Sequence, residues 1–241
     1  MIQKTKVFKN MVIISSLALC HSFSAAKKYV LTGGPGNGKT TIIQTLQSRG
    51  FKTLPEVATT IIEDAIKQGL PNPTHGNDIC GFQEAVAKKQ VELESMLNKK
   101  DLVFLDRGII DGLAYCDHHQ LISLPPTLQE KTSSTNYTAV FVLDFVEDSY
   151  QTDSVRIENL KEALIIHELI IKHYRNLGYS PIFVPAFQCD ENGKKLSTLE
   201  STAKRAEFIL KHISETSYKQ TPPFNNIASD KTIDVTVTKN L

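Results

Sequence analysis

The stretch GGPGNGKT at residues 33–40 matches the pattern GxxxxGK(S/T), with an apolar run before it and a helical apolar pattern after it. Glycines at these positions let successive backbone N–H groups converge on phosphate oxygens at a helix N-terminus. The Lys39 ammonium supplies a charge for the β- and γ-phosphates, and the Thr40 hydroxyl is a ligand for Mg²⁺. The predicted nucleotide-binding residues are Gly33, Gly34, Pro35, Gly36, Asn37, Gly38, Lys39, Thr40 and Thr41.

A second motif lies at residues 102–106, where Asp106 comes directly after four apolar residues. An acid at the carboxyl end of a strand beside the phosphate loop can hold Mg²⁺, directly or through water. We therefore predict Thr40 and Asp106 as the metal residues. Arg107 comes next, and either reaches phosphate or substrate or pairs with a nearby acid.

Two further residues are candidates for the chemistry. Glu56 follows the second predicted strand, so it would point toward the ligand crevice and orient or deprotonate a substrate hydroxyl; alternatively it is an acid favoured by a helix N-terminus. Arg156 follows a loop at the start of a predicted helix and either neutralises transition-state charge or lies in solvent. The predicted catalytic residues are Lys39, Glu56, Asp106, Arg107 and Arg156. Arg205 is expected to be an ordinary surface or ion-pair residue.

Strand and helix patterns alternate along the chain. Short apolar runs typical of strands cover residues 28–32, 51–54, 102–105, 139–143 and 182–184. Helical patterns cover 40–49, 56–68, 82–99, 156–176 and 199–214, and the third has Phe82, Val86, Val91, Leu93 and Leu97 as its expected inner positions. This alternation predicts an α/β fold with a five-stranded parallel sheet covered on both faces, in three layers.

Composition narrows the function classes. The 241 residues are 41% hydrophobic and 22% charged, which excludes global disorder. A balance of 27 Lys and Arg against 26 Asp and Glu gives a net charge of +1, so no nucleic-acid partner is expected. No apolar run approaches the roughly 20 residues of a transmembrane helix, so no span is expected in the mature chain. The four cysteines form no CxxC pair and are expected to be buried thiols.

The chain divides into three parts. Residues 1–26 have three lysines, a ten-residue apolar segment and then small residues, the order of a secretory signal peptide. Such a segment would direct export of the protein and be cleaved after Ser24 or Ala26. Alternatively, the start codon is misassigned and the protein is cytoplasmic. Residues 27–215 form the nucleotide-binding domain, and 216–241 are predicted to be a polar C-terminal tail. His167-Glu168 opens like HExxH, but Ile171 replaces the second histidine, so no zinc site is expected.

These motifs resemble one family, the AAA-type P-loop domain shared by the ribosylnicotinamide kinase domain of NadR and a GTP-binding protein implicated in TRP-channel trafficking. The matching stretches lie within residues 28–210, at 30–41, 55–58, 82–83, 106–108 with Asp111, 153–156, 174–179 and 184–185. The resemblance implies a P-loop NTPase fold with the nucleoside-kinase-like strand order 2-3-1-4-5. The family includes both kinases and apparent switches. Its members are mostly cytosolic, unlike a chain with an export signal.

Two hypotheses follow. In the first, the protein binds ATP or GTP with Mg²⁺ and transfers a phosphoryl group to a small hydroxyl-bearing acceptor such as a nucleoside. In the second, it is a switch or regulatory module that reads nucleotide state without a small-molecule acceptor. The two differ at Glu56 and Arg107, because an acceptor pocket needs both beside the γ-phosphate and a switch does not. The sequence does not identify a protein partner.

Overall fold

The computed structural model describes residues 25–76, 78–145 and 159–219. Its strands are β1 Lys27–Thr32, β2 Lys52–Leu54, β3 Leu102–Asp106, β4 Ala139–Leu143 and β5 Ile182–Val184. Its helices are α1 Lys39–Ser48, α2 Val57–Lys67, the 3-10 helix Pro73–His75, α3 Ile79–Ser95, α4 Asp111–His118, α5 Pro126–Lys131, α6 Leu160–Asn176 and α7 Thr198–Lys219. The predicted signal segment up to residue 24, Arg156, and the tail from residue 220 onward lie outside the described residues.

The five strands form one parallel sheet in the order β2-β3-β1-β4-β5, which confirms the predicted fold and strand order. The central strand β1 pairs with β3 on one side, where Val30 faces Leu105, and with β4 on the other, where Leu31 faces Phe141. Each of the three central strands contains an apolar run, at residues 29–31 in β1, 102–105 in β3 and 139–143 in β4, because helices cover both faces of the sheet.

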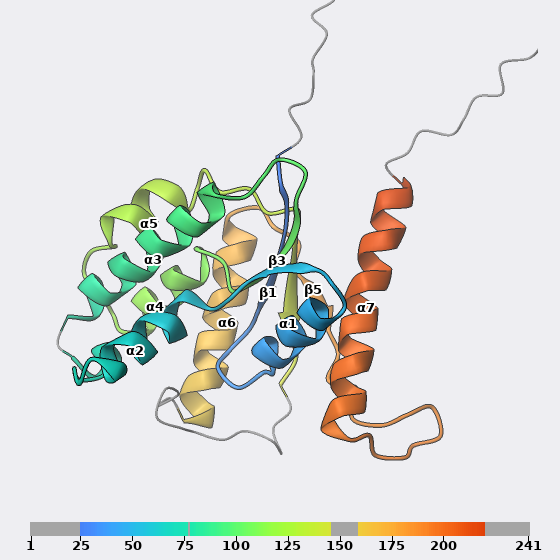
Figure 1. Cartoon of the computed structure of the whole chain (residues 1–241). Helices are drawn as coiled ribbons and strands as arrows, with labels where there is room; N and C mark the ends of the chain where they lie inside the picture. The colour runs from blue at the N-terminus through green and yellow to red at the C-terminus, as the bar shows by residue number, and fades with distance from the viewer. Residues whose placement is uncertain (1–24, 77, 146–158, 220–241) are drawn as a thin grey trace, which may run out of the picture.

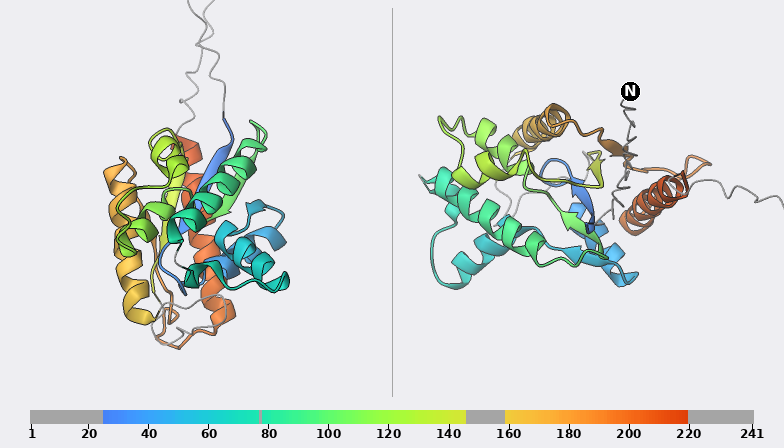
Figure 2. Two further views of the ribbon diagram at one scale, coloured as in Figure 1. Left: turned by 90° about the vertical axis from the view of Figure 1, so that its left-hand side faces the viewer. Right: turned by 90° about the horizontal axis from the view of Figure 1, so that it is seen from above.

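Two separate apolar cores lie on the two faces of the sheet. On one face, α1 and α7 pack on the sheet through residues such as Leu46 and Ile209. On the other face, α3, α4, α5 and α6 pack around residues such as Leu113 and Ile170. Figure 1 shows α7 on one side of the sheet and α3 to α5 on the opposite side, and the views of Figure 2 agree with this three-layer arrangement.

Three helices differ from the sequence prediction. Helix α3 begins three residues before the predicted Phe82, because the Asp78 side chain caps it by accepting a hydrogen bond from the Gly81 N–H, and it ends at Ser95. Its expected inner positions other than Phe82 are only partly buried, and Leu97 lies beyond the helix. Helix α6 begins after the predicted Arg156, since Asn159 forms a capping box with Glu162. Helix α7 continues beyond the predicted residue 214.

Two short helices, α4 and α5, escaped the prediction, because each has fewer residues than a helical apolar pattern needs to become visible. In Figure 1 they lie on the same side of the sheet as α3, and α4, which follows Arg107 along the chain, packs against α6. None of the described helices combines the length and the apolar character that crossing a bilayer requires.

Candidate functional site

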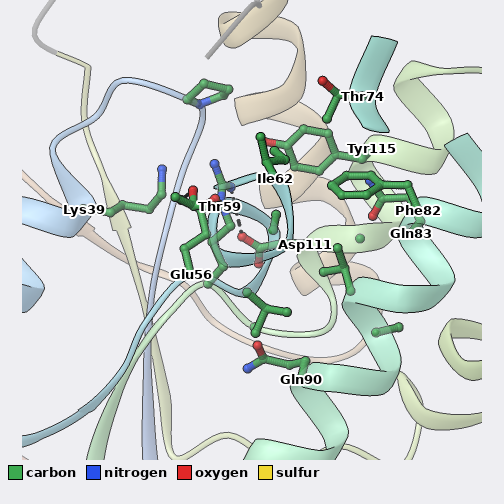
Figure 3. A pocket seen from close by; sticks show the side chains of 18 of the residues that line it. Lys39, Glu56, Thr59, Ile62, Thr74, Phe82, Gln83, Gln90, Asp111 and Tyr115 are labelled. Atoms are coloured by element: carbon green, nitrogen blue, oxygen red, sulfur yellow. Dashed lines mark hydrogen bonds and ion pairs between the residues drawn. The ribbon is translucent and has the colours of Figure 1, made fainter. Parts of the chain in front are cut away.

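A cavity of about 530 Å³ opens beside the phosphate loop, at the edge of the sheet where β1, β2 and β3 end. Because these strands are parallel, the loops that follow them meet at this edge. They bring Lys39, Glu56 and Arg107 to one end of the cavity, while α2, α3 and α4 form the other end. Figure 3 shows Lys39 and Glu56 on one side and Phe82, Gln83 and Tyr115 on the other.

The phosphate loop holds its lysine with its own backbone. The Lys39 Nζ donates to the carbonyl oxygens of Gly33 at 3.0 Å and Gly34 at 2.8 Å, and the side chain is buried. Burial, and after it the charge of Arg107, lowers the pKa of Lys39 to about 8. The ammonium is therefore poorly solvated in the free protein, and an incoming phosphate supplies the negative charge that it lacks.

The two predicted metal residues lie against each other. The Thr40 Oγ1 donates to Asp106 Oδ2 at 2.8 Å. The other carboxylate oxygen, Asp106 Oδ1, is buried and has no hydrogen-bond partner among the described residues. Burial, and then the charge of Glu56, raises the pKa of Asp106 to about 6. A hydroxyl and a carboxylate oxygen in need of a partner fit a hard divalent cation such as Mg²⁺.

Arg107 connects three parts of the site. Its backbone has a φ of 74°, an uncommon value for a residue with a side chain, and its N–H donates to the Leu31 carbonyl at 3.0 Å. Its guanidinium donates through Nε to Glu56 Oε1, and through Nη1 to the Gly33 carbonyl at 3.2 Å and to Asp111 Oδ2 at 3.3 Å. The arginine therefore pairs with nearby acids and lines the cavity at the same time.

Glu56 is the N-cap residue of α2, but its side chain makes no capping hydrogen bond. Its carboxylate instead accepts from Arg107 and from the Thr59 hydroxyl at 3.1 Å. Burial acts to raise the pKa of Glu56, but the charges of Arg107 and Lys39 outweigh it and hold the pKa below its usual value. Glu56 is therefore a carboxylate held in place at the cavity wall beside the phosphate loop, rather than a helix cap.

Asp111 anchors Arg107 from behind and was not singled out by the analysis of candidate site residues. It is 3% exposed, and its carboxylate accepts from the Thr32 hydroxyl at 2.6 Å and the Tyr174 hydroxyl at 2.7 Å. These partners come from β1 and α6, so Asp111 ties the site to both the sheet and the helix that covers it. Two signals in the sequence pointed to it: its match, together with residues 106–108, to the AAA-type P-loop family, and its place four residues after Arg107, about one helical turn away.

The opposite flank of the phosphate loop packs against α6. His167 Nδ1 accepts from the Gly34 N–H at 3.2 Å and lies 3.3 Å from the Asn37 amide nitrogen, which donates to the Leu143 carbonyl at 2.6 Å. Because Nδ1 is an acceptor here, the imidazole is neutral with its proton on Nε2. Burial lowers the pKa of His167, consistent with that neutral form. His167 therefore braces the phosphate loop from α6.

Arg205 corrects a prediction. It is 4% exposed rather than a surface residue, and no salt bridge with an acid is found for it among the described residues. Its guanidinium donates to the carbonyls of Asn37 at 2.8 Å, Pro185 at 3.0 Å and Asp144. Burial lowers the pKa of Arg205 to about 10. Three carbonyls at the ends of the phosphate loop, β4 and β5 therefore share one donor from α7, a role that no short motif encodes.

The far end of the cavity is lined by aromatic and amide side chains. From the sequence, Phe82 was predicted as an inner position of a helix, and Phe82-Gln83 was named only as a stretch that resembles the AAA-type P-loop family. Gln83 is 5% exposed and faces the cavity together with Phe82, which is 8% exposed. Tyr115, from α4, lines the cavity as well, with the Arg107 guanidinium carbon 5.4 Å from the centre of its ring. Tyr115 therefore stands between the charged end of the cavity and the aromatic end.

The cysteines correct a second prediction, because only Cys116 of the described cysteines is buried; Cys80 is partly buried and Cys189 is exposed. Burial raises the pKa of the Cys116 thiol to about 12, so this thiol is unreactive. Within the described residues, no group of three or more His, Cys, Asp or Glu side chains could hold a metal ion.

The sequence matches the family described as the AAA domain over residues 28–191. It is also 25% identical, over 140 residues, to a protein of Archaeoglobus fulgidus named "putative adenylate kinase". That alignment covers 58% of this chain and 70% of the archaeal protein.

Solved structures of kinases share the fold. A thymidylate kinase from Candida albicans has a TM-score of 0.54 and 15% identity, with coverage of 80% of this chain and 93% of the kinase. A deoxyadenosine kinase from M. mycoides has a TM-score of 0.52 and 13% identity, covering 78% and 99%. NadR in complex with NR has a TM-score of 0.52 and 16% identity, covering 76% of this chain and 51% of NadR. At these identities the likeness concerns the fold, and it agrees with the three-layer P-loop architecture.

Proposed function

Because the chain belongs to the AAA domain family, we propose that it is a P-loop kinase that transfers the γ-phosphoryl group of ATP or GTP to a hydroxyl of a small, nucleoside-like acceptor. One observation carries this proposal: the cavity beside the phosphate loop is lined by both Glu56 and Arg107. A switch without an acceptor has no need of a cavity of about 530 Å³ there, whereas pockets for small ligands typically enclose roughly 300–1,000 Å³.

Glu56 is the candidate for orienting the acceptor hydroxyl. Its carboxylate is held by Arg107 and the Thr59 hydroxyl, so it is ionised and fixed before the acceptor arrives. An ionised carboxylate accepts a hydrogen bond from a hydroxyl, and takes its proton as the oxygen bonds to phosphorus and becomes more acidic. Such general-base help is worth about 10²–10⁴-fold in rate. Positioning of the hydroxyl adds to it.

Lys39, Arg107 and the loop amides supply the charge stabilisation. The Lys39 ammonium donates to the carbonyl oxygens of Gly33 and Gly34 in the free protein. When the nucleotide binds, it would exchange these partners for phosphate oxygens. Thr40 and Asp106 would hold Mg²⁺, which when bound would supply positive charge against the negative charge that develops during the transfer. Arg156 stays a candidate for transition-state charge, as predicted from the sequence.

The charge at the cavity favours an acceptor without a phosphate of its own. Among the described residues at the charged end, the cations Lys39 and Arg107 lie with the acids Glu56 and Asp111. Arg107 is already paired with both acids, and Lys39 is committed to the loop that takes the nucleotide. A dianionic phosphate on the acceptor would therefore find two carboxylates at this end, and no unpaired cation among the described residues there. A neutral nucleoside hydroxyl meets no such repulsion.

An acceptor screen tests the proposal. Release of ADP or GDP is measured with Mg²⁺ and each nucleoside, and separately with each nucleoside monophosphate, for the wild type, Glu56→Gln and the control Glu92→Gln on the exposed surface of α3. We expect nucleosides to stimulate release, and Glu56→Gln to lower turnover about 10²–10⁴-fold while nucleotide affinity is kept. If no acceptor stimulates release, the switch hypothesis replaces this one; equal turnover of Glu56→Gln and wild type removes Glu56 from the chemistry.

For localisation, we propose that residues 1–26 are a signal peptide that directs export. The first described strand begins at Lys27, directly after this segment, and its N–H is already bonded to the Asp101 carbonyl at 2.8 Å. Cleavage after Ser24 or Ala26 would therefore leave the domain's hydrogen bonds intact. N-terminal sequencing of the protein from its native host should give a start at Ala25 or Lys27, whereas an intact Met1 in the cytosol would refute export.

A further inference from the structure

Gln83 has a buried side chain without a protein partner. It is 5% exposed, and no hydrogen bond to its amide occurs among the described residues. Its atoms face the cavity, on the side away from Lys39 in Figure 3. Gly112 lies against it on α4: a Cβ there would lie 3.5 Å from Gln83 Oε1, so the absence of a side chain leaves that oxygen uncovered. The Gln83 amide is not among the fully buried, unpartnered polar groups of the described residues, so its atoms reach the space of the cavity, where a ligand group can pair with them.

A second glutamine on the same helix shows what a structural amide looks like here. Gln90 lies two turns further along α3, is equally 5% exposed, and lines the same cavity. Its amide nitrogen, however, donates to Glu94 Oε1 at 2.8 Å. Glu94 in turn holds Lys28 at 2.7 Å and the Tyr137 hydroxyl at 3.0 Å. Gln90 is therefore part of the framework, whereas Gln83 is not.

Two aromatic side chains accompany the free amide. The ring of Phe82 is nearly buried, lines the cavity, and makes no ring contact with another aromatic side chain within the described ranges. Tyr115 also lines the cavity, but it comes from α4, whereas Phe82 and Gln83 come from α3. Figure 3 shows both rings on the same side of the cavity as Gln83. Flat apolar faces beside an amide that can both donate and accept suit a planar heterocycle with polar atoms on its edge.

On this geometry we propose that the far end of the cavity is a base-binding subsite, in which the Gln83 amide reads the hydrogen-bonding edge of a heterocyclic base that lies against Phe82 and Tyr115. The subsite rests on the proposed function, because it places the base at one end and the sugar hydroxyl at the other, beside Glu56. Its ligand is an uncharged nucleoside whose base carries a donor and an acceptor side by side. Gln83 is its specificity-determining residue.

The test measures nucleoside binding by calorimetry, with no dependence on turnover. The probes are adenosine, guanosine, cytidine and uridine, and benzimidazole riboside, which keeps a flat base and the sugar but has no donor on the base edge. The variants are Gln83→Met and the matched control Gln90→Met, which has the same residue change and the same burial on the same helix. Retained affinity for Mg²⁺ and ATP or GTP verifies that each variant is folded.

We expect at least one natural nucleoside to bind the wild type more tightly than benzimidazole riboside does. Gln83→Met should weaken that nucleoside about 10–100-fold, the worth of two lost hydrogen bonds, and leave benzimidazole riboside within about twofold. Gln90→Met should keep the wild-type preference. Phe82→Leu should weaken all the probes that bind, because stacking does not depend on the base edge.

The outcomes separate this inference from the proposed function. If Gln83→Met weakens the nucleoside and benzimidazole riboside equally, or weakens neither, Gln83 reads no base and the subsite is refuted, even where the kinase reaction is observed. If Gln83-dependent binding is found but no phosphoryl transfer, the subsite stands and the kinase proposal fails. If none of the nucleosides binds the wild type, the subsite is refuted.

Discussion

The two flanks of the phosphate loop are built from opposite kinds of interaction. The flank that faces the cavity carries charges: Lys39 lies within it, Arg107 donates to the Gly33 carbonyl, and Asp106 accepts from Thr40. On the flank that packs against the helices, no ion pair is found within the described structure: His167 is neutral, and the Arg205 guanidinium, although charged, bonds to backbone carbonyls.

This difference separates two tasks. The charged flank is incomplete without a ligand, as the buried and unpartnered Asp106 Oδ1 shows, and it gains interactions when nucleotide and metal arrive. On the helix-facing flank, the His167, Arg205 and Asn37 Nδ2 groups already have protein partners, although the buried Asn37 Oδ1 has none among the described residues, so these bonds fix the shape of the loop before any ligand binds. Substitutions on the first flank should change binding and leave stability nearly intact, and those on the second should change stability first. Four predictions test this division, from the largest effect to the smallest.

Lys39→Ala should have the largest effect. Loss of the only charged side chain within the loop motif should weaken binding of Mg²⁺ and ATP or GTP by more than about 100-fold, because removing one partner of a buried, hydrogen-bonded charge pair typically costs about 2–5 kcal/mol. Stability should change little, since the ammonium is desolvated in the free protein. Calorimetry gives the affinity and thermal unfolding the stability, with the exposed Lys67→Ala as control. Unchanged affinity in the folded variant would sink the assignment of the loop.

Arg205→Met should chiefly destabilise the protein. It leaves three buried or partly buried carbonyls without their donor, which we expect to cost about 3 kcal/mol of unfolding free energy, at roughly 1 kcal/mol or more for each. Urea unfolding measures this cost. The control is Arg49→Met, whose arginine is exposed and lies 3.9 Å from Glu207, and which should stay within about 0.5 kcal/mol. Equal stability of the two variants would mean that Arg205 does not brace the loop.

Gly34→Ala tests how closely the loop approaches α6. A Cβ at this position would meet the Ala163 carbonyl oxygen and lie 2.8 Å from the Phe145 ring, so the loop or the helix must shift. We expect a loss of about 1–3 kcal/mol of stability. Gly76→Ala is the matched control, because its nearest contact would be an ordinary 3.5 Å and its φ is not positive. The same stability for both variants, measured by urea unfolding, would contradict this close packing.

His167 should make stability depend on pH. Its pKa is lowered in the folded state, so below the ordinary value of 6.5 the unfolded chain binds a proton that the folded protein resists. Stability is therefore full above pH 6.5 and falls as the pH drops below it, by at most about 1.4 kcal/mol per pH unit. His167→Asn should remove this contribution, and the exposed His119→Asn should keep it. Unfolding curves between pH 5 and 8 decide; identical slopes for wild type and His167→Asn would refute the neutral brace.

The same division explains how much could be predicted from the sequence. The five strands and the phosphate loop leave local patterns, and Asp106 and Arg107 are adjacent to one of those strands, so all were predicted. His167 lies 133 residues from Gly34 and Arg205 lies 168 residues from Asn37, and each makes its bond to a backbone atom, which any residue can supply. Such contacts leave no spacing to recognise. Arg205 was predicted at the surface because an isolated arginine usually lies there.

Gln83 appeared in the sequence analysis only within the stretch 82–83 that resembles the AAA-type P-loop family, and no role was predicted for it. On a helix whose inner face was expected to be apolar, a glutamine reads as an outer residue, and only the three-dimensional arrangement shows that it is buried beside a cavity. Asp111 was obscured similarly, because α4 is too short for its inner face to be evident. Both are polar side chains buried beside a cavity, where the general pattern predicts apolar residues. Once the fold is known, such a departure from the pattern is itself a signal of function.

The central claim is that an uncharged nucleoside receives the γ-phosphoryl group. The most direct measurement incubates the protein with γ-³²P-labelled ATP or GTP, Mg²⁺ and the nucleoside selected by the acceptor screen, and separates the products. We predict labelled nucleoside monophosphate from the wild type and none from Lys39→Ala. Label found only in inorganic phosphate would contradict the account.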